Sequence, residues 1–118
     1  MNKPTLTIDI TRSDVRTIVQ PRGDINITQS PVLRAKLKAL IEEGPPSVIL
    51  DLSDVKFMDS SGIATLIEML QICRNAHIPF SLCSLQVRVR SVFEISRLET
   101  VFSIYDSLES AIGVDTSE

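Results

Sequence analysis

Hydrophobic and polar residues alternate near the start of the chain, and this pattern predicts two consecutive strands. The apolar positions of the first strand are Leu6, Ile8 and Ile10, with polar residues between them. A period of two is typical of a strand with one buried face. Residues 15–20 are rich in β-branched side chains, and the polar residues 12–14 separate them from the first strand. Together the two segments predict an antiparallel hairpin, followed by a turn at residues 21–24.

A helical pattern follows this turn. Ser30 is a favoured N-cap residue, and Pro31 suits the first helical position. The apolar residues that share one helical face are Leu33, Leu37, Leu40 and Ile41. Gly44 and the two prolines after it predict the end of the helix, because glycine suits the position after the C-cap and proline cannot continue the helix.

The second half of the chain alternates between predicted strands and helices. Strands are predicted at residues 48–52, 79–83 and 102–105, and the first of these is expected at the centre of the sheet. A second amphipathic helix is predicted after Asp59-Ser60-Ser61-Gly62, and the residues of its apolar face are Ile63, Leu66, Ile67, Leu70 and Cys73. Ser84 is predicted to cap a third helix, which carries Val89, Val92 and Phe93. A short terminal helix is predicted at residues 107–112.

This order predicts a single α/β domain over residues 1–113. Strands that alternate with helices imply right-handed crossovers and a largely parallel sheet, which the N-terminal hairpin makes mixed. We expect about five strands and about four helices. Residues 114–118 are predicted to form a flexible C-terminal tail.

Composition narrows the classes of function. The 118 residues include 12 Lys and Arg against 15 Asp and Glu, with a formal net charge of −3. This balance does not favour binding to nucleic acid or to an anionic membrane. His77, Cys73 and Cys83 are too few ligands for a zinc site, and we expect no cofactor. Both cysteines lie in apolar stretches and are interpreted as small buried hydrophobic residues.

The sequence also bears on location. The N-terminus lacks the basic start and the apolar stretch of a signal peptide. Apolar runs in this chain are all much shorter than the ~20 residues of a membrane span. We therefore expect the protein to be cytoplasmic, where thiols stay reduced.

One segment combines reactive groups with a defined structural position, the tetrapeptide Asp59-Ser60-Ser61-Gly62 between the central strand and the next helix. Functional groups in an open α/β sheet gather at the carboxyl ends of the strands. The tetrapeptide could simply cap the helix, because Asp and Ser are favoured N-cap residues worth about 1 kcal/mol. It could also present Ser60 as a phosphoacceptor, which would add about −1.5 to −2 charge. A catalytic serine is disfavoured, because the one imidazole, that of His77, lies roughly 20 Å away along the same helix.

The run VILDLSDVKFMDSSG, residues 48–62, resembles the signature of STAS domains, specifically of the bacterial anti-anti-sigma factors, or anti-sigma factor antagonists. The resemblance covers nearly the whole chain, including Gly23-Asp24-Ile25 and the closing residues 87–112. It implies that Ser60 is phosphorylated by a partner, an anti-sigma factor of the GHKL serine kinase type. It further implies that the unphosphorylated protein, a monomer when free, binds this kinase and releases the sigma factor or another client. Phosphorylation would end that binding, and a PP2C-type phosphatase would restore it.

We expect the partner-binding surface to join the segment before the first helix to the tetrapeptide and to a flank of the second helix. The predicted members are Asn26, Ile27, Thr28, Gln29, Met58, Ile63, Met69 and Ile72. Met69 and Ile72 lie beside the predicted core face at helical spacing, and they could equally widen that face.

Two positions depart from the family's pattern. Asn26 stands where the family commonly has Asp, so one charge beside the docking surface is missing. Arg97 stands where the family often has Gly, so we expect the third helix to end differently. An alternative function on the same fold is that of a non-phosphorylated adaptor subunit of a transporter or a stress-sensing complex. The intact Ser60 favours the phosphorylated antagonist.

Overall fold

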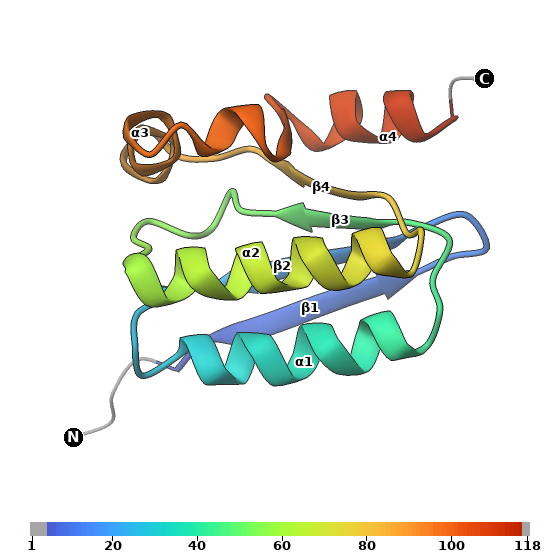
Figure 1. Ribbon diagram of the computed structural model, residues 1–118, viewed down its shortest axis with the longest axis horizontal. Coiled ribbons are helices and arrows are strands. Elements are labelled where there is room, and N and C mark those ends of the chain that lie inside the picture. Colours follow the sequence, from blue (N-terminus) through green and yellow to red (C-terminus); the bar gives the residue numbers. More distant parts are fainter. Residues whose placement is uncertain (1–4, 117–118) are drawn as a thin grey trace.

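The computed structural model describes residues 5–116, whose strands and helices follow one another in the predicted order (Figure 1). The strands are β1 (Thr7–Arg12), β2 (Thr17–Arg22), β3 (Val48–Asp51), β4 (Phe80–Cys83) and β5 (Ser103–Tyr105). The helices are α1 (Ser30–Glu42), α2 (Ser60–Asn75), α3 (Val87–Ile95) and α4 (Leu108–Thr116), with a short 3₁₀ turn, η1, at Leu98–Thr100.

The strands form one mixed sheet in the order β1-β2-β3-β4-β5. β1 and β2 pair antiparallel as a hairpin, and β2 to β5 pair parallel. α1 and α2 pack side by side on one face of the sheet, whereas α4 lies against β4 and β5 on the other (Figure 1). These observations confirm the predicted single α/β fold, with its N-terminal hairpin and its four helices.

The main core lies between the sheet and the helices that cover its inner face. All four residues of β3 are buried, as expected of the central strand. Val19, Leu50 and Leu82, from three neighbouring strands, are fully buried and belong to one apolar cluster with side chains of α1 and α2. This packing fixes the position of the β2 and β3 carboxyl ends, from which the two loops of the candidate site emerge.

A smaller apolar cluster on the outer face joins Ile49 and Cys83 to Ala111 of α4. Cys73 belongs to the main core, so both cysteines are fully buried. Burial raises the pKa of each thiol to about 11. The cysteines are therefore packed hydrophobic residues, as predicted, and not reactive thiolates.

β2 extends further than its sequence pattern predicted. Pro21 and Arg22, which the sequence pattern predicts in the turn, belong to the strand and pair with Ile8 and Thr7 of β1. Gly23, with φ at 125°, is the residue at which the chain leaves the strand. Cross-strand pairing thus overrides the local preference of proline for turns, and it places Arg22 at the carboxyl end of β2.

The predicted N-cap of α1 is wrong by one residue. Ser30 is the first helical residue, and Gln29 occupies the N-cap position without capping the helix through its side chain. The side chain that orders this entry is that of Asn26, whose Oδ1 accepts hydrogen bonds from the N–H groups of Thr28 and Gln29, both at 3.0 Å. The end of α1 follows the prediction, since Gly44 comes directly after the C-cap with φ at 73°.

Two predictions in the C-terminal part are also wrong. Ser84 does not cap α3, because it adopts a left-handed conformation at the end of β4 (φ 60°) and the helix begins only after Gln86. Helix α4 continues to Thr116, so residues 114–116 are helical and not a tail. Residues 117 and 118 lie outside the described part of the chain.

Arg97 also corrects an expectation. It adopts the left-handed conformation, with φ at 61°, that a glycine would supply at the end of α3. Its carbonyl accepts a hydrogen bond from the Thr100 hydroxyl at 2.7 Å, which helps to hold the turn into η1. The chain therefore makes the same turn without glycine, at a conformational cost of about 1–2 kcal/mol for a non-glycine residue.

Candidate functional site

The candidate site is built from two loops that leave the carboxyl ends of β2 and β3. We name them the β2–α1 loop, residues 23–29, and the β3–α2 loop, residues 52–59. Three backbone hydrogen bonds join them: Gly23 N–H donates to the Asp54 carbonyl (3.1 Å), Ile25 N–H to Phe57 (3.0 Å), and Asp59 N–H to Ile25 (3.1 Å). The pairing of Ile25 with Met58 is a parallel β-bridge. The two loops therefore form one structural unit.

Asp59 is the N-cap of α2 and also the link between the two loops. Its Oδ1 accepts hydrogen bonds from Ser61 N–H at 2.9 Å and from Gly62 N–H at 3.4 Å. Its Oδ2 accepts a hydrogen bond from Ile27 N–H, on the other loop, at 3.1 Å. The hydrogen bond from the Ser61 hydroxyl, followed by these backbone bonds, lowers the pKa of the Asp59 carboxyl. The capping interpretation of the tetrapeptide is correct for Asp59.

The two serines of the tetrapeptide differ in their surroundings. Ser61 is half-buried, and its hydroxyl donates to Asp59 Oδ1 at 2.5 Å. Ser60, the first residue of α2, is exposed, and within residues 5–116 its hydroxyl makes no hydrogen bond. The hydroxyl of Ser60 is therefore the one that an external group can reach without breaking an internal contact.

Gly62 allows the β2–α1 loop to approach the start of α2 closely. A Cβ atom at this position would lie 2.6 Å from Met58 Cγ and 2.8 Å from Ile25 Cγ2. It would also lie 3.1 Å from the Ile25 carbonyl oxygen, which is a backbone atom. Since these distances are shorter than van der Waals contact, any side chain at position 62 would force Ile25 and Met58 away from the start of α2.

Apolar side chains are exposed on both loops. Ile27 is 74% exposed on the β2–α1 loop, and Phe57 is 40% exposed on the β3–α2 loop. Asn26 and Gln29 are half-buried in the same loop as Ile27 because their side chains hold the backbone: Gln29 Oε1 accepts from Leu6 N–H at 3.3 Å. Each loop thus presents one exposed apolar side chain, and the two loops are joined to each other and to the tetrapeptide by hydrogen bonds.

The structure changes the membership of the predicted partner-binding surface. Met69 is fully buried in the main core, and Met58 and Ile63 are also buried, so these three side chains are not available to a partner. Ile72 is partly buried and packs against the core. The segment of residues 26–29 does lie beside the tetrapeptide, as predicted, because Asp59 binds the Ile27 N–H group directly.

Phe57 is not among the residues that the sequence predicts for the partner-binding surface. The sequence signal that could have identified Phe57 is an aromatic residue two positions before the tetrapeptide, in a chain with only 4% aromatic residues.

The structure gives little support for a catalytic serine, a metal site or a membrane-spanning helix. His77 follows the opposite end of the 16-residue helix α2, about 24 Å from Ser60 at 1.5 Å per residue. Among the residues that the structure describes, acidic, histidine and cysteine side chains form no cluster able to hold a metal ion. None of the helices in the described part of the chain is long and apolar enough to cross a membrane.

Comparison with known proteins identifies the family of this chain. The family model described as STAS domain matches residues 7–111. The chain is 31% identical over 106 residues, 90% of each chain, to a putative anti-sigma factor antagonist, BtrV, of Bordetella bronchiseptica.

Two solved structures have the same fold. The crystal structure of a putative anti-sigma factor antagonist from Thermotoga maritima has a TM-score of 0.88 at 22% identity, covering 93% of this chain and 95% of that one. The phosphorylated form of the Bacillus cell fate determinant SpoIIAA has a TM-score of 0.70 at 20% identity, covering 92% and 97%.

Proposed function

The chain belongs to the STAS domain family, and on this premise we propose that it is an anti-sigma factor antagonist controlled by phosphorylation of Ser60. Its relative in Bordetella bronchiseptica is named as a putative antagonist of this kind. The Bacillus protein of the same fold has a phosphorylated form. Both facts support the proposal, which depends mainly on the site itself.

The observation that carries the proposal is the contrast between Ser60 and Ser61. Ser60 is exposed and its hydroxyl is free of internal hydrogen bonds in the described chain, whereas Ser61 binds Asp59. The carboxylate next to Ser60 in the sequence, that of Asp59, accepts hydrogen bonds from four donors and is therefore poorly placed to act as a general base for Ser60. A kinase partner would have to supply both ATP and the base, and a GHKL-type anti-sigma kinase is such a partner.

The charge of a phosphoryl group explains how the switch would work. A phosphate on Ser60 would carry about −1.5 to −2 charge beside the Asp59 carboxylate. Asp59 already binds the N–H groups of Ser61 and Gly62, so these groups are not free to bind the phosphate. A dianion without partners costs several kcal/mol when a protein covers it, and each 1.4 kcal/mol weakens binding about tenfold.

We therefore assign a partner-switching cycle to this chain. The unphosphorylated protein, acting in the cytoplasm as a single domain, binds the anti-sigma kinase and displaces the sigma factor or another client. Phosphorylation of Ser60 ends that binding, and a PP2C-type phosphatase restores it. The fold is expected to persist in both states, since Ser60 is exposed and outside the core.

The proposed docking surface consists of the exposed parts of the two loops around Ser60. Residues 26–29 supply Ile27, the most exposed apolar side chain beside the tetrapeptide, and Phe57 supplies a second apolar group. An Ile27→Ser variant should bind the kinase more weakly without loss of stability. Val15→Ser is the control, because Val15 is 54% exposed but lies in the turn between β1 and β2, at the opposite end of β2 from the β2–α1 loop. Equal affinities for the two variants would contradict this assignment.

Phosphorylation mapping tests the proposal. The wild-type chain, Ser60→Ala and Ser61→Ala are incubated with ATP and a GHKL-type kinase that binds the wild-type chain, and peptides are then analysed by mass spectrometry. We expect one phosphate on Ser60 in the wild type and in Ser61→Ala, and none in Ser60→Ala. A kinase that binds the wild-type chain and leaves it unmodified would support the adaptor alternative and overturn the proposal.

A further inference from the structure

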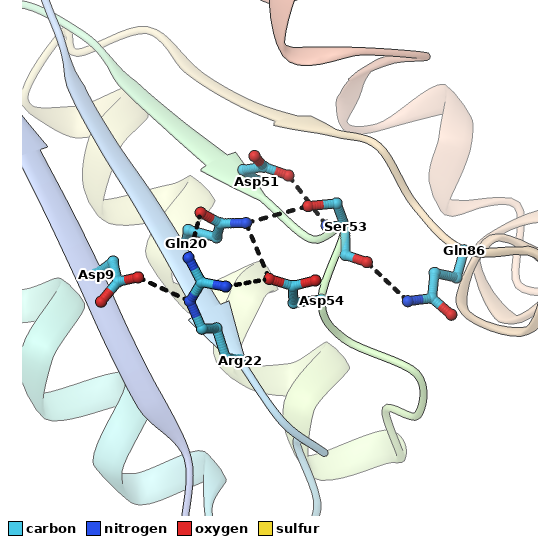
Figure 2. A network of polar contacts seen from close by, with 7 residues as sticks. All are labelled: Asp9, Gln20, Arg22, Asp51, Ser53, Asp54 and Gln86. Carbon is cyan, nitrogen blue, oxygen red and sulfur yellow. Dashed lines mark hydrogen bonds and ion pairs between the residues drawn. The ribbon is translucent and has the colours of Figure 1, made fainter.

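The outer face of the sheet carries a connected group of polar side chains that the proposed function has not used (Figure 2). The strand register places Asp9 of β1 opposite Gln20 of β2, and Arg22 lies two residues further along the same face. Helix α4 covers mainly β4 and β5 on this face, and Asp9, Arg22 and Asp54 are exposed. We call the group Asp9, Gln20, Arg22, Ser53 and Asp54 the outer polar network.

Arg22 is the centre of the outer polar network. Its Nε donates to Asp9 Oδ2 at 2.7 Å, and its Nη1 donates to Asp54 Oδ2 at 2.6 Å. Its Nη2 donates to Gln20 Oε1 at 3.3 Å. The guanidinium group is therefore held from three directions and joins β1 to the β3–α2 loop, as Figure 2 shows. A lysine could not make these contacts together, because its ammonium group lacks the planar fork.

The start of the β3–α2 loop is held by further side chains. Gln20 Nε2 donates to Ser53 Oγ and to Asp54 Oδ2, both at 3.2 Å. Gln86, just before α3, donates from Nε2 to the Ser53 carbonyl at 2.7 Å. Asp51 Oδ1 accepts from Ser53 N–H at 3.0 Å. Residues 53 and 54 are thus fixed from β2, β3 and the α3 entry at once (Figure 2).

The outer polar network acts where the pairing of the two loops begins. Gly23, the neighbour of Arg22, donates its N–H to the carbonyl of Asp54, and this is the first of the hydrogen bonds that lead to Ile25 and then to Asp59. The inner side of the same loop is anchored independently, because Val55 and Met58 are buried in the main core. Loss of the network should therefore loosen the loops without unfolding the domain.

From this arrangement we propose that Arg22 is a positioning residue, which holds the β3–α2 loop in register with the β2–α1 loop and so sets the geometry that a partner of Ser60 meets. The inference rests on the proposed function for its effect on the partner. The effect on the loops themselves does not depend on it. Isolated surface ion pairs contribute little to stability. The contacts of Arg22 differ from such pairs because they hold a loop in position.

The chain contains a matched control. Arg12 forms a two-pronged ion pair with Glu43, with Nε at 2.9 Å and Nη2 at 3.0 Å from the carboxylate oxygens. The side chains of Arg12 and Arg22 are about equally exposed, at 53% and 50%. The Arg12 pair ties β1 to the end of α1, at the opposite end of the strands from the two loops. Arg12→Met therefore removes a similar ion pair without touching the site.

Amide hydrogen exchange, followed residue by residue by NMR, tests the proposal on the free protein. In Arg22→Met, exchange should accelerate at the N–H groups of Gly23, Ile25, Ile27 and Asp59, and not in the central strand β3. Coupling energies of 0.5–2 kcal/mol correspond to an acceleration of roughly 2- to 30-fold. Arg12→Met should leave these four groups unchanged, and Arg22→Lys should fall between wild type and Arg22→Met.

A kinetic measurement adds the functional side. With the kinase that phosphorylates the wild-type chain, Arg22→Met should raise the KM for the chain by a similar factor and leave kcat nearly unchanged. The proposal is overturned if Arg22→Met and Arg12→Met behave alike, or if exchange accelerates evenly through the sheet. If no kinase modifies the wild-type chain, the proposed function fails, and the exchange experiment still decides whether Arg22 positions the loops.

Discussion

Replacing Gly62 with alanine tests the close approach on which the site depends. The new Cβ would stand 2.6 Å from Met58 Cγ and 2.8 Å from Ile25 Cγ2. Neither is the free end of a flexible side chain, and both residues are buried. Overpacking of this kind costs about 1–3 kcal/mol, while the better helix propensity of alanine returns up to about 1 kcal/mol. We expect a net loss of about 1–2 kcal/mol in the free energy of unfolding.

Gly113→Ala provides the control for this prediction. Gly113 also lies in a helix, α4, and a Cβ there would meet nothing within 4 Å. The same substitution should therefore leave the chain equally stable or stabilise it by up to about 1 kcal/mol. Urea denaturation at constant m-value gives both free energies, and thermal unfolding should place the midpoint of Gly62→Ala roughly 5–10 °C below wild type. If Gly62→Ala proved as stable as Gly113→Ala, the packing described around the tetrapeptide would be wrong.

Three further predictions concern the cap, a left-handed residue and the thiols. Asp59→Ala should cost about 1 kcal/mol or more of stability, whereas Asp59→Asn should keep most of the cap but lose the acceptor for Ile27 N–H, which NMR exchange would detect. The hydrogen bonds of Asp59 lower the pKa of its carboxyl below the ordinary 3.8. Their contribution to the free energy of unfolding is therefore complete above pH 3.8 and is lost as the pH falls through the folded-state pKa. Urea denaturation at a series of acid pH values should show this loss in wild type and not in Asp59→Asn. Arg97→Gly should stabilise the chain by about 1 kcal/mol in urea denaturation, since it relieves the left-handed conformation, and destabilisation would contradict that account. Cys73 and Cys83, with pKa values near 11, should resist a thiol reagent in the native chain at pH 8 and react readily in denaturant.

The architecture was predictable from the sequence because each element has a strong local pattern. The alternation around Ile8 and Ile10 and the apolar run of β3 were sufficient to predict the hairpin and the central strand. The position of the tetrapeptide between the central strand and the next helix indicated the site, the resemblance then assigned the phosphorylation to Ser60, and the local chemistry of Asp59 predicted a cap. Which of the two serines is free required the structure, because only the contact of Ser61 with Asp59 distinguishes them.

The errors arose where packing or pairing between distant segments decides the outcome. Met69 was expected beside the core face, but α2 packs against both the sheet and α1, so the buried stripe of this helix is wider than that of a helix with one neighbour. Arg22 was read as a turn residue, because its pairing with Thr7 depends on the register of the hairpin. The outer polar network could not be predicted from the sequence for the same reason, because its members lie on different strands and loops (Figure 2).

The central claim, that phosphorylation of Ser60 controls binding, is tested most directly by comparing the affinity of one anti-sigma kinase for the chain with and without phosphate on Ser60. Calorimetric titration of the two purified forms gives both dissociation constants, and thermal unfolding of each form reports on the fold. We expect the phosphorylated form to bind at least about 100-fold more weakly, equivalent to roughly 2.7 kcal/mol, with nearly the same unfolding midpoint. Equal affinities for the two forms would contradict the account, and so would a loss of binding accompanied by unfolding.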